Sequence, residues 1–227
     1  AGVDTSKPGF NVRAHYRPIT DPQTSEPLAG YEMENTIARA EAQVYGLRGA
    51  NLLTTPSTTE EGVINYSFDV NADGTTTQYG AFQASADADG DGTPDNLDAH
   101  YPDTTPWGID PNLDTSNIAA VIDTYVYFPE AGVYTVVFNS DDGFRTTSFA
   151  NVNDVLNATI VSQADVGRGA TDTATTIYIP AEGYYPMRTA YMQGGGGANL
   201  EWSGYQTVPA ITTRRLLNDG TKADALK

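Results

Sequence analysis

A twelve-residue acidic window, residues 87–98, has the side chains and the spacing of a calcium loop. Carboxylates stand at positions 1, 3, 5, 9 and 12 of the window, and Gly92 stands at position 6. Alternate carboxylates can face a hard cation, position 7 can offer its backbone carbonyl, and glycine permits the sharp turn. The alternative is a solvated acidic loop, which is what most charge runs are. The ligands that the pattern predicts are Asp87, Asp89, Asp91, Thr93, Asp95 and Asp98.

A second group of candidate ligands comes from two separate places in the sequence. Asp141 and Asp142 end a β-like run, where adjacent acids are costly unless a partner compensates their charge. A strained backbone, such as a cis peptide between them, would let both carboxylates face one ion. Further along, Gln193 precedes four glycines at 194–197, which can bend so that backbone carbonyls converge on one point. The alternative for the acid pair is a structural turn with solvated side chains.

The composition limits the possible partners. The chain has 227 residues, with 29 acids against 12 bases and a formal net charge of −17. Nucleic acids and anionic membranes need a basic surface, so we expect neither as a partner. The sequence contains no run of about 18 apolar residues, so it predicts no membrane-spanning helix. The absence of Cys excludes disulfides and thiol chemistry, and bound calcium could take the stabilising role of a disulfide.

The sequence favours a binding protein over an enzyme. The two histidines, His15 and His100, lie far apart, and without Cys a zinc site is not expected. The sequence shows no Ser-His-Asp motif. A glycosidase would need a pair of carboxylates, but metal-binding loops account better for the many acids of this chain. Asn65 and Asn157 match the N-glycosylation acceptor sequence, which is a weak signal in a bacterial chain. The small residues 1–3 would fit a mature end left by signal cleavage.

The elements that must position these residues are mostly strands. Residues 1–30 contain four prolines and no sustained period, so they predict an extended arm. A short helix is expected within residues 32–46, capped by Asn35 and stopped by Gly46. Residues 63–70 alternate between apolar and polar side chains and predict a half-buried strand.

Two later stretches are similar to each other and predict paired strands. Tyr-Phe-Pro-Glu-Ala-Gly-Val-Tyr at 127–134 resembles Tyr-Ile-Pro-Ala-Glu-Gly-Tyr-Tyr at 178–185. We expect two similar hairpins in facing sheets of one sandwich. The expected division of the chain is an N-terminal arm at 1–30, one β-sandwich domain at 31–218 with an acidic insertion at about 85–117, and a C-terminal tail at 219–227.

The C-terminal two fifths of the chain resemble a known family. The segment from about Val121 to Gly204 contains both of these stretches, Ser-Asp-Asp-Gly-Phe at 140–144, Gly-Tyr-Tyr-Pro-Met-Arg at 183–188 and a glycine-rich loop before Leu-Glu-Trp at 200–202. It resembles the protective-antigen-type β-sandwich, or PA-fourteen domain, whose members include yeast flocculins and bacterial adhesin lectin modules. The resemblance implies an all-β, antiparallel, jelly-roll-like β-sandwich, here with one short helix and a calcium-ordered insertion. The acidic window resembles a thrombospondin type-3 calcium repeat.

The resemblance also implies roles for the second group of ligands. In the sugar-binding members, two adjacent Asp joined by a cis peptide hold calcium, and a downstream loop adds an amide side chain and backbone carbonyls. Here the acids would be Asp141 and Asp142, the amide Gln193, and the carbonyls those of Gly195 and Gly197. Calcium accepts six to eight oxygens, so two sugar hydroxyls can complete its shell, with the weak affinity expected of a shallow site.

Two functions follow as hypotheses. The first is a secreted, calcium-dependent glycan-binding module for cell-surface adhesion, with calcium as its cofactor and glycans as its partners. The second is a structural subunit of an extracellular fibre or surface layer, which self-associates when residues 1–17 add a strand to a neighbouring copy. Both place the chain outside a bacterial cell.

Overall fold

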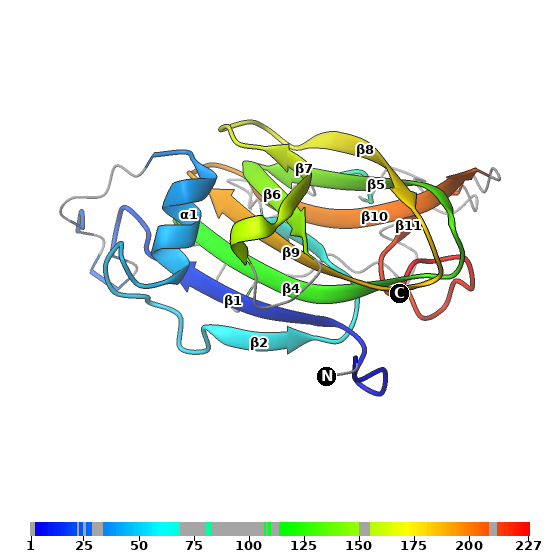
Figure 1. Ribbon diagram of the computed structural model, residues 1–227. Helices are drawn as coiled ribbons and strands as arrows, with labels where there is room; N and C mark the ends of the chain where they lie inside the picture. Colours follow the sequence, from blue (N-terminus) through cyan, green and yellow to red (C-terminus); the bar gives the residue numbers. More distant parts are fainter. Residues whose placement is uncertain are drawn as a thin grey trace.

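The structure is a computed structural model, and it describes residues 3–21, 23–24, 26–28, 34–68, 80–82, 107, 109, 114–149, 155–208 and 213–227. These residues form two antiparallel β-sheets with one helix on the outside (Figure 1). The prediction of an all-β sandwich with one short helix is thereby confirmed. The predicted calcium loop at 87–98 lies outside the described residues.

The six-stranded sheet has the strand order β2-β1-β4-β9-β6-β7, and the second sheet has the order β11-β10-β5-β8, with β3 also paired to β10. Among the described residues, no helix is long and apolar enough to span a membrane.

The bounds of the elements are β1 (Phe10–Tyr16), α1 (Ile37–Val44), β2 (Ser57–Glu60), β3 (Asn65–Phe68), β4 (Ile118–Phe128), β5 (Gly132–Asp141), β6 (Gly143–Ser148), a short 3-10 helix (Val155–Asn157), β7 (Thr159–Ala164), β8 (Thr171–Ile179), β9 (Gly183–Gln193), β10 (Ala198–Val208) and β11 (Arg215–Leu216).

The core lies between the two sheets. Successive side chains of a strand point to opposite faces, so every second residue of the long strands faces the other sheet. The rings of Phe138 on β5 and Phe144 on β6 stack with centroids 4.5 Å apart, and Trp202 on β10 lies 5.0 Å from Phe138. One cluster of buried residues joins both sheets, which makes the two layers a single packed unit.

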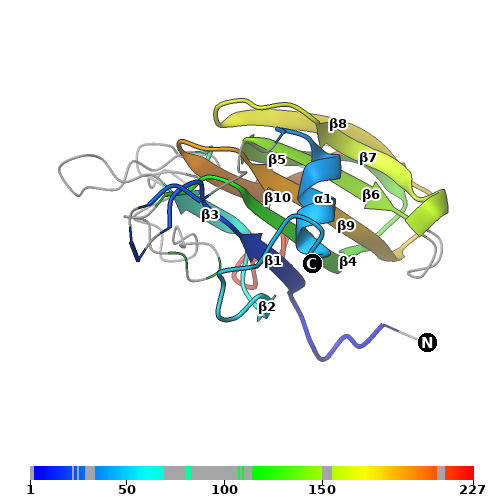
Figure 2. The same cartoon turned by 90° about the vertical axis from the view of Figure 1, so that its left-hand side faces the viewer.

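Helix α1 covers the outer face of the six-stranded sheet, where it lies across β4 and β9 (Figure 2). Its apolar stripe, which includes Ile37, Ala40 and Val44, packs on Ala119 and Met192 of those strands. The helix forms within the predicted range, but its cap is one residue later than predicted. The Thr36 hydroxyl, and not Asn35, accepts the Arg39 N–H at 3.2 Å.

The N-terminal segment differs from the extended arm predicted for residues 1–30. Residues 10–16 form β1, which pairs with β2 on one side and β4 on the other. The prolines on both sides of this segment obscured its period of two in the sequence. Because β1 holds a place in its own sheet, a fibre built by this segment would require exchange of β1 between copies. The buried side chains of β1 include Phe10, Val12, Ala14 and Tyr16.

The residues predicted as a C-terminal tail, 219–227, fold back onto the sandwich. Leu226 is 5% exposed and belongs to the main core cluster. Its carbonyl accepts the Asn218 N–H at 2.6 Å. The buried apolar residues of this polar segment are Ala225 and Leu226.

The two stretches predicted as hairpins, 127–134 and 178–185, connect the two sheets instead. β4 and β9 belong to the six-stranded sheet, whereas β5 and β8 belong to the other. The turns between β4 and β5 and between β8 and β9 therefore cross from one layer to the other. Turn chemistry is a local property and could be predicted, but the pairing partner of each strand depends on contacts far apart in the sequence.

Candidate functional site

Three crossings between the sheets meet at one end of the sandwich. β5 passes to β6 at Asp141–Asp142, β7 passes to β8 across residues 165–170, and β9 passes to β10 across residues 194–197. The pairing of β5 with β10 places Asn199 opposite Asp141. The fold thus brings the predicted acid pair to the predicted glycine-rich loop.

The acid pair connects the three crossings. The peptide bond between Asp141 and Asp142 is cis, as expected. Asp142 is 6% exposed, and its two carboxylate oxygens accept backbone N–H bonds of 2.7 Å each, Oδ1 from Arg168 and Oδ2 from Gly194. Asp141 is half-buried, and its carbonyl accepts the Tyr191 hydroxyl at 2.5 Å. One buried carboxylate therefore fixes the β7–β8 and β9–β10 connections relative to the β5–β6 turn.

Gln193 presents a buried oxygen at the base of the glycine-rich loop. Its side chain is fully buried, and its amide Nε2 donates to the Gly197 carbonyl at 2.7 Å. Within the described part of the chain, its Oε1 has no hydrogen-bond partner. A buried acceptor without a partner is costly, so this oxygen is available to a ligand.

The glycine-rich loop is held from both sides. Asn117 N–H donates to the Gly194 carbonyl at 3.1 Å, and the Thr115 hydroxyl donates to the Gly196 carbonyl at 2.5 Å. A Cβ at Gly194 would lie 2.2 Å from Asn35 Oδ1, so a larger residue there would require the Asn35 side chain to move. Gly195 lies exposed at the tip of the loop. The loop therefore offers backbone at the surface without a side chain to cover it.

Two arginines that sequence reasoning missed lie beside the acid pair. The Arg168 guanidinium donates to the Asp142 carbonyl at 3.3 Å and to Ser140 Oγ at 2.7 Å. Arg39 is 1% exposed and donates to the Gln193 carbonyl at 3.1 Å. Burial lowers the pKa of Arg39 to about 10, and the negative charge of Asp142 opposes that shift. These guanidinium groups supply part of the charge compensation that the sequence analysis assigned to a cation.

The donor set fits calcium. Nowhere in the described ranges do three or more Asp, Glu, His or Cys side chains form a group that could hold a metal ion. A cation here would therefore be bound by two carboxylates, the Gln193 amide oxygen and backbone carbonyls. These are all oxygen ligands, which calcium prefers. The unpartnered Oε1 of Gln193 is the observation that favours such a ligand.

The other residues singled out in the sequence have different outcomes. All six predicted ligands of the acidic window lie outside the described residues, so that site stays a prediction. His15 is a buried core residue whose Nε2 contacts the Gly49 carbonyl at 3.2 Å. Of the two possible glycosylation sites, Asn65 is buried and Asn157 is exposed.

The segment that precedes the acidic window is anchored by Glu201. The carboxylate of Glu201 is fully buried and accepts the N–H groups of Ala81 at 2.9 Å and Phe82 at 3.0 Å. Burial raises the pKa of Glu201 to about 8, although both N–H bonds favour the charged form. A Cβ at Gly80 would lie 1.8 Å from Glu201 Oε1, so the anchor requires glycine there.

Solved structures share this fold. The A domain of epithelial adhesin 6 from Candida glabrata, solved with Galb1-3GlcNAc, is 14% identical, with a TM-score of 0.57 over 99% of this chain and 92% of that chain. The A domain of epithelial adhesin 9 from the same organism, solved with Galb1-4GlcNAc, is 16% identical, with a TM-score of 0.54 over 96% and 89%. The PA14 domain of the MpAFP antifreeze protein is 15% identical, with a TM-score of 0.51 over 93% and 87%. At these identities the likeness shows the fold alone.

The family assignment comes from the sequence match. No curated protein matches the chain. The PA14 domain family, in contrast, matches residues 74–210, which is more than half of the chain and includes the acid pair and the glycine-rich loop. The chain therefore belongs to the PA14 domain family.

Proposed function

We propose that this chain is a calcium-dependent glycan-binding module that acts in adhesion at the cell surface or in the secreted fraction, and that it is not an enzyme. One observation carries the proposal. The buried carboxylate of Asp142 accepts the Gly194 N–H, and this contact sets the acid pair against the glycine-rich loop, at whose base Gln193 has an unpartnered buried oxygen.

The residues of the site would divide the work as follows. Asp141 and Asp142 would supply carboxylate oxygens, Gln193 its Oε1, and Gly195 and Gly197 backbone carbonyls. A calcium ion bound there would supply the remaining coordination positions to sugar hydroxyls, because it accepts six to eight oxygens. The hydrogen bonds to Asp142 keep both loops in place before a ligand arrives.

The exposed tip of the glycine-rich loop suits a sugar ring. Gly195 and Gly196 carry no side chain and are exposed, so a glycan can approach the backbone closely. The two Candida glabrata adhesin domains were solved with Galb1-3GlcNAc and Galb1-4GlcNAc. We therefore choose galactose-containing disaccharides as the first ligands to test. A site with so few atoms predicts weak affinity for a single sugar.

A glycan array tests the proposal. The intact chain is applied with calcium and again after chelation, beside Asp142→Asn and a matched surface variant, Asp224→Asn. Asp224 pairs with Arg215 at 3.1 Å, and neither residue belongs to the site. We expect calcium-dependent binding by the unmodified chain and by Asp224→Asn, and none by Asp142→Asn. Binding that survives chelation, or an array without any bound glycan, would contradict the proposal.

A further inference from the structure

An opening lies at the side of β4, because β1 and β4 part before β4 ends. The β1–β4 pairing extends no further toward the N-terminus than Asn11 opposite Asp123, whereas β4 continues to Phe128. The preceding residues 3–9 are not paired with β4 in the sheet. Gly9 has a φ of 119°, and a Cβ there would lie 2.2 Å from the Glu60 carbonyl oxygen, so the backbone conformation there depends on glycine.

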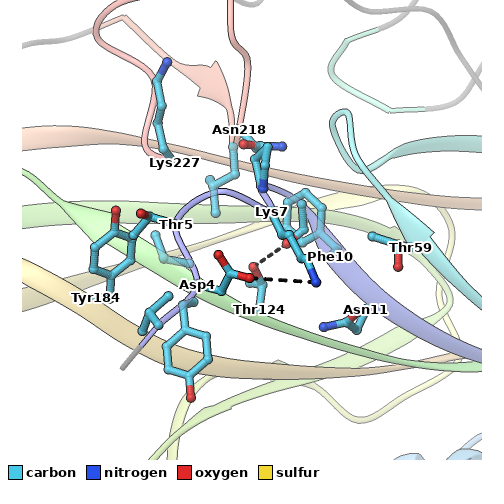
Figure 3. A pocket seen from close by; sticks show the side chains of 16 residues that line it. Asp4, Thr5, Lys7, Phe10, Asn11, Thr59, Thr124, Tyr184, Asn218 and Lys227 are labelled. Carbon is cyan, nitrogen blue, oxygen red and sulfur yellow. Dashed lines mark hydrogen bonds and ion pairs between the residues drawn. The ribbon is translucent and has the colours of Figure 1, made fainter. Parts of the chain in front are cut away.

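The opening is bounded by Gly9 on one side and by Lys227 on the other. On one side, the Gly9 carbonyl accepts the Thr124 hydroxyl at 2.9 Å. On the other side, the Tyr127 N–H donates to the Lys227 carbonyl. Between these two contacts, the stretch of β4 around Tyr125 faces a cavity of about 460 Å³ (Figure 3). This volume lies in the range of small-molecule sites.

The lining has the character of a carbohydrate site. Tyr125 and Tyr184 line the cavity, are 37% and 42% exposed, and lie outside the main core cluster. The Tyr184 ring also contacts Tyr127, with the ring centroids 4.9 Å apart. Asn11 and Thr59, both exposed, add an amide and a hydroxyl on the opposite side. A sugar has apolar C–H faces and a rim of hydroxyls, and it needs both kinds of partner.

The charges in the lining favour a neutral ligand. Asp4 and Lys7 pair at 3.8 Å, and both are seen together in the cavity in Figure 3. The remaining charged side chain of the lining is Lys227. The side chains of the lining thus carry a net charge of only +1 on a chain of net charge −17, and the lining lacks the paired acids that a calcium-bound sugar would need.

The cavity is separate from the Asp141–Asp142 site. Ile118, at one end of β4, pairs with Gln193 of that site. Thr124 lies six residues further along the strand, which corresponds to about 20 Å at the rise of a β-strand. One sugar unit cannot touch both places.

We propose that this cavity is a second, cation-independent binding site for a neutral oligosaccharide, with Tyr125 and Tyr184 stacking on sugar rings and Asn11 and Thr59 bonding to hydroxyls. The site goes beyond the function proposed above, because it uses none of the same residues. A chain with both sites would bind a polysaccharide at two points, which raises its avidity without any change in either site.

The test is a titration of the metal-free intact chain, in EDTA, with maltotriose, cellotriose and laminaritriose, followed by NMR. We expect at least one trisaccharide to shift the ring signals of Tyr125 and Tyr184. In Tyr125→Ala and Tyr184→Ala the affinity should fall about tenfold or more, as expected when a stacking ring is lost. Tyr178→Ala is the matched control, since Tyr178 is 70% exposed on β8 of the other sheet. Its affinity should not change.

A further variant separates this site from the calcium site. Asp142→Asn should keep the trisaccharide response in EDTA, whatever the fate of calcium-dependent binding. The proposal is overturned if no trisaccharide shifts the two tyrosines, if their replacement leaves the affinity unchanged, or if binding requires calcium and disappears in Asp142→Asn. Thermal melts check that the two tyrosine variants fold. We expect them to fold, because both side chains are partly exposed and lie outside the core.

Discussion

Asp142 and Glu201 are both buried acids near the same end of β10, but they have different surroundings. Asp142 accepts two backbone N–H groups and has the guanidinium groups of Arg168 and Arg39 beside it. Glu201 also accepts two N–H groups, but its burial outweighs them and its pKa rises to about 8. This difference supports the ligand role proposed for Asp142, whereas Glu201 is a structural anchor.

The raised pKa of Glu201 predicts how stability depends on pH. Its folded pKa of about 8 exceeds its ordinary value of 4.5, although Arg214 nearby favours the charged form and Asp172 opposes it. Between these two values the folded state binds more protons, so the free energy of unfolding falls as the pH rises. From about pH 5 to about pH 8, the loss should be about 3 kcal/mol larger than in Glu201→Gln, which does not titrate. Urea denaturation at both pH values measures it, and parallel losses in the two proteins would refute the assignment.

The elements around the site could be predicted only in part. The strands, the helix and the acid pair carry local signals: alternation, a short apolar stripe and an unusual Asp-Asp-Gly turn. The crossing of each turn between the sheets has no local signal, because it depends on which strands pair. Arg39 and Arg168 were missed for the same reason, since each reaches the site from a different element and neither lies in a motif.

The connection that Asp142 makes between loops predicts a local effect of its removal. In Asp142→Ala, the amides of Arg168 and Gly194 lose their acceptor, and each unsatisfied buried donor is costly. We expect a loss of about 2 kcal/mol in the free energy of unfolding and faster hydrogen exchange at these two amides. The control is Asp123→Ala, because Asp123 is 40% exposed and pairs with Arg13 at 3.7 Å. Unchanged exchange at Gly194 in Asp142→Ala would show that the carboxylate does not hold the loop.

For the molecule as a whole, the excess of acids is the property that the fold leaves least explained. Arg39 and Arg168 lie beside the Asp141–Asp142 pair, and other described arginines pair with further acids such as Asp123, Asp172 and Asp224. Even so, 29 acids face only 12 bases in the chain. The acidic window at 87–98 follows, in the sequence, the segment that Glu201 anchors, and it contains the six residues that match the calcium-loop pattern. Composition predicts a cation-binding protein, and the calcium ligands at both places remain a prediction.

The melting temperature of the metal-free chain, recorded with and without saturating calcium, tests the claim that these clustered acids are calcium ligands. Calcium at a hundred times its dissociation constant adds about 2.7 kcal/mol for one site, which corresponds to a rise of about 5 °C or more for a domain of this size. We predict such a rise for the unmodified chain and a smaller one for the double variant Asp141→Asn with Asp142→Asn. An identical melting temperature with calcium and after exhaustive chelation would contradict the account.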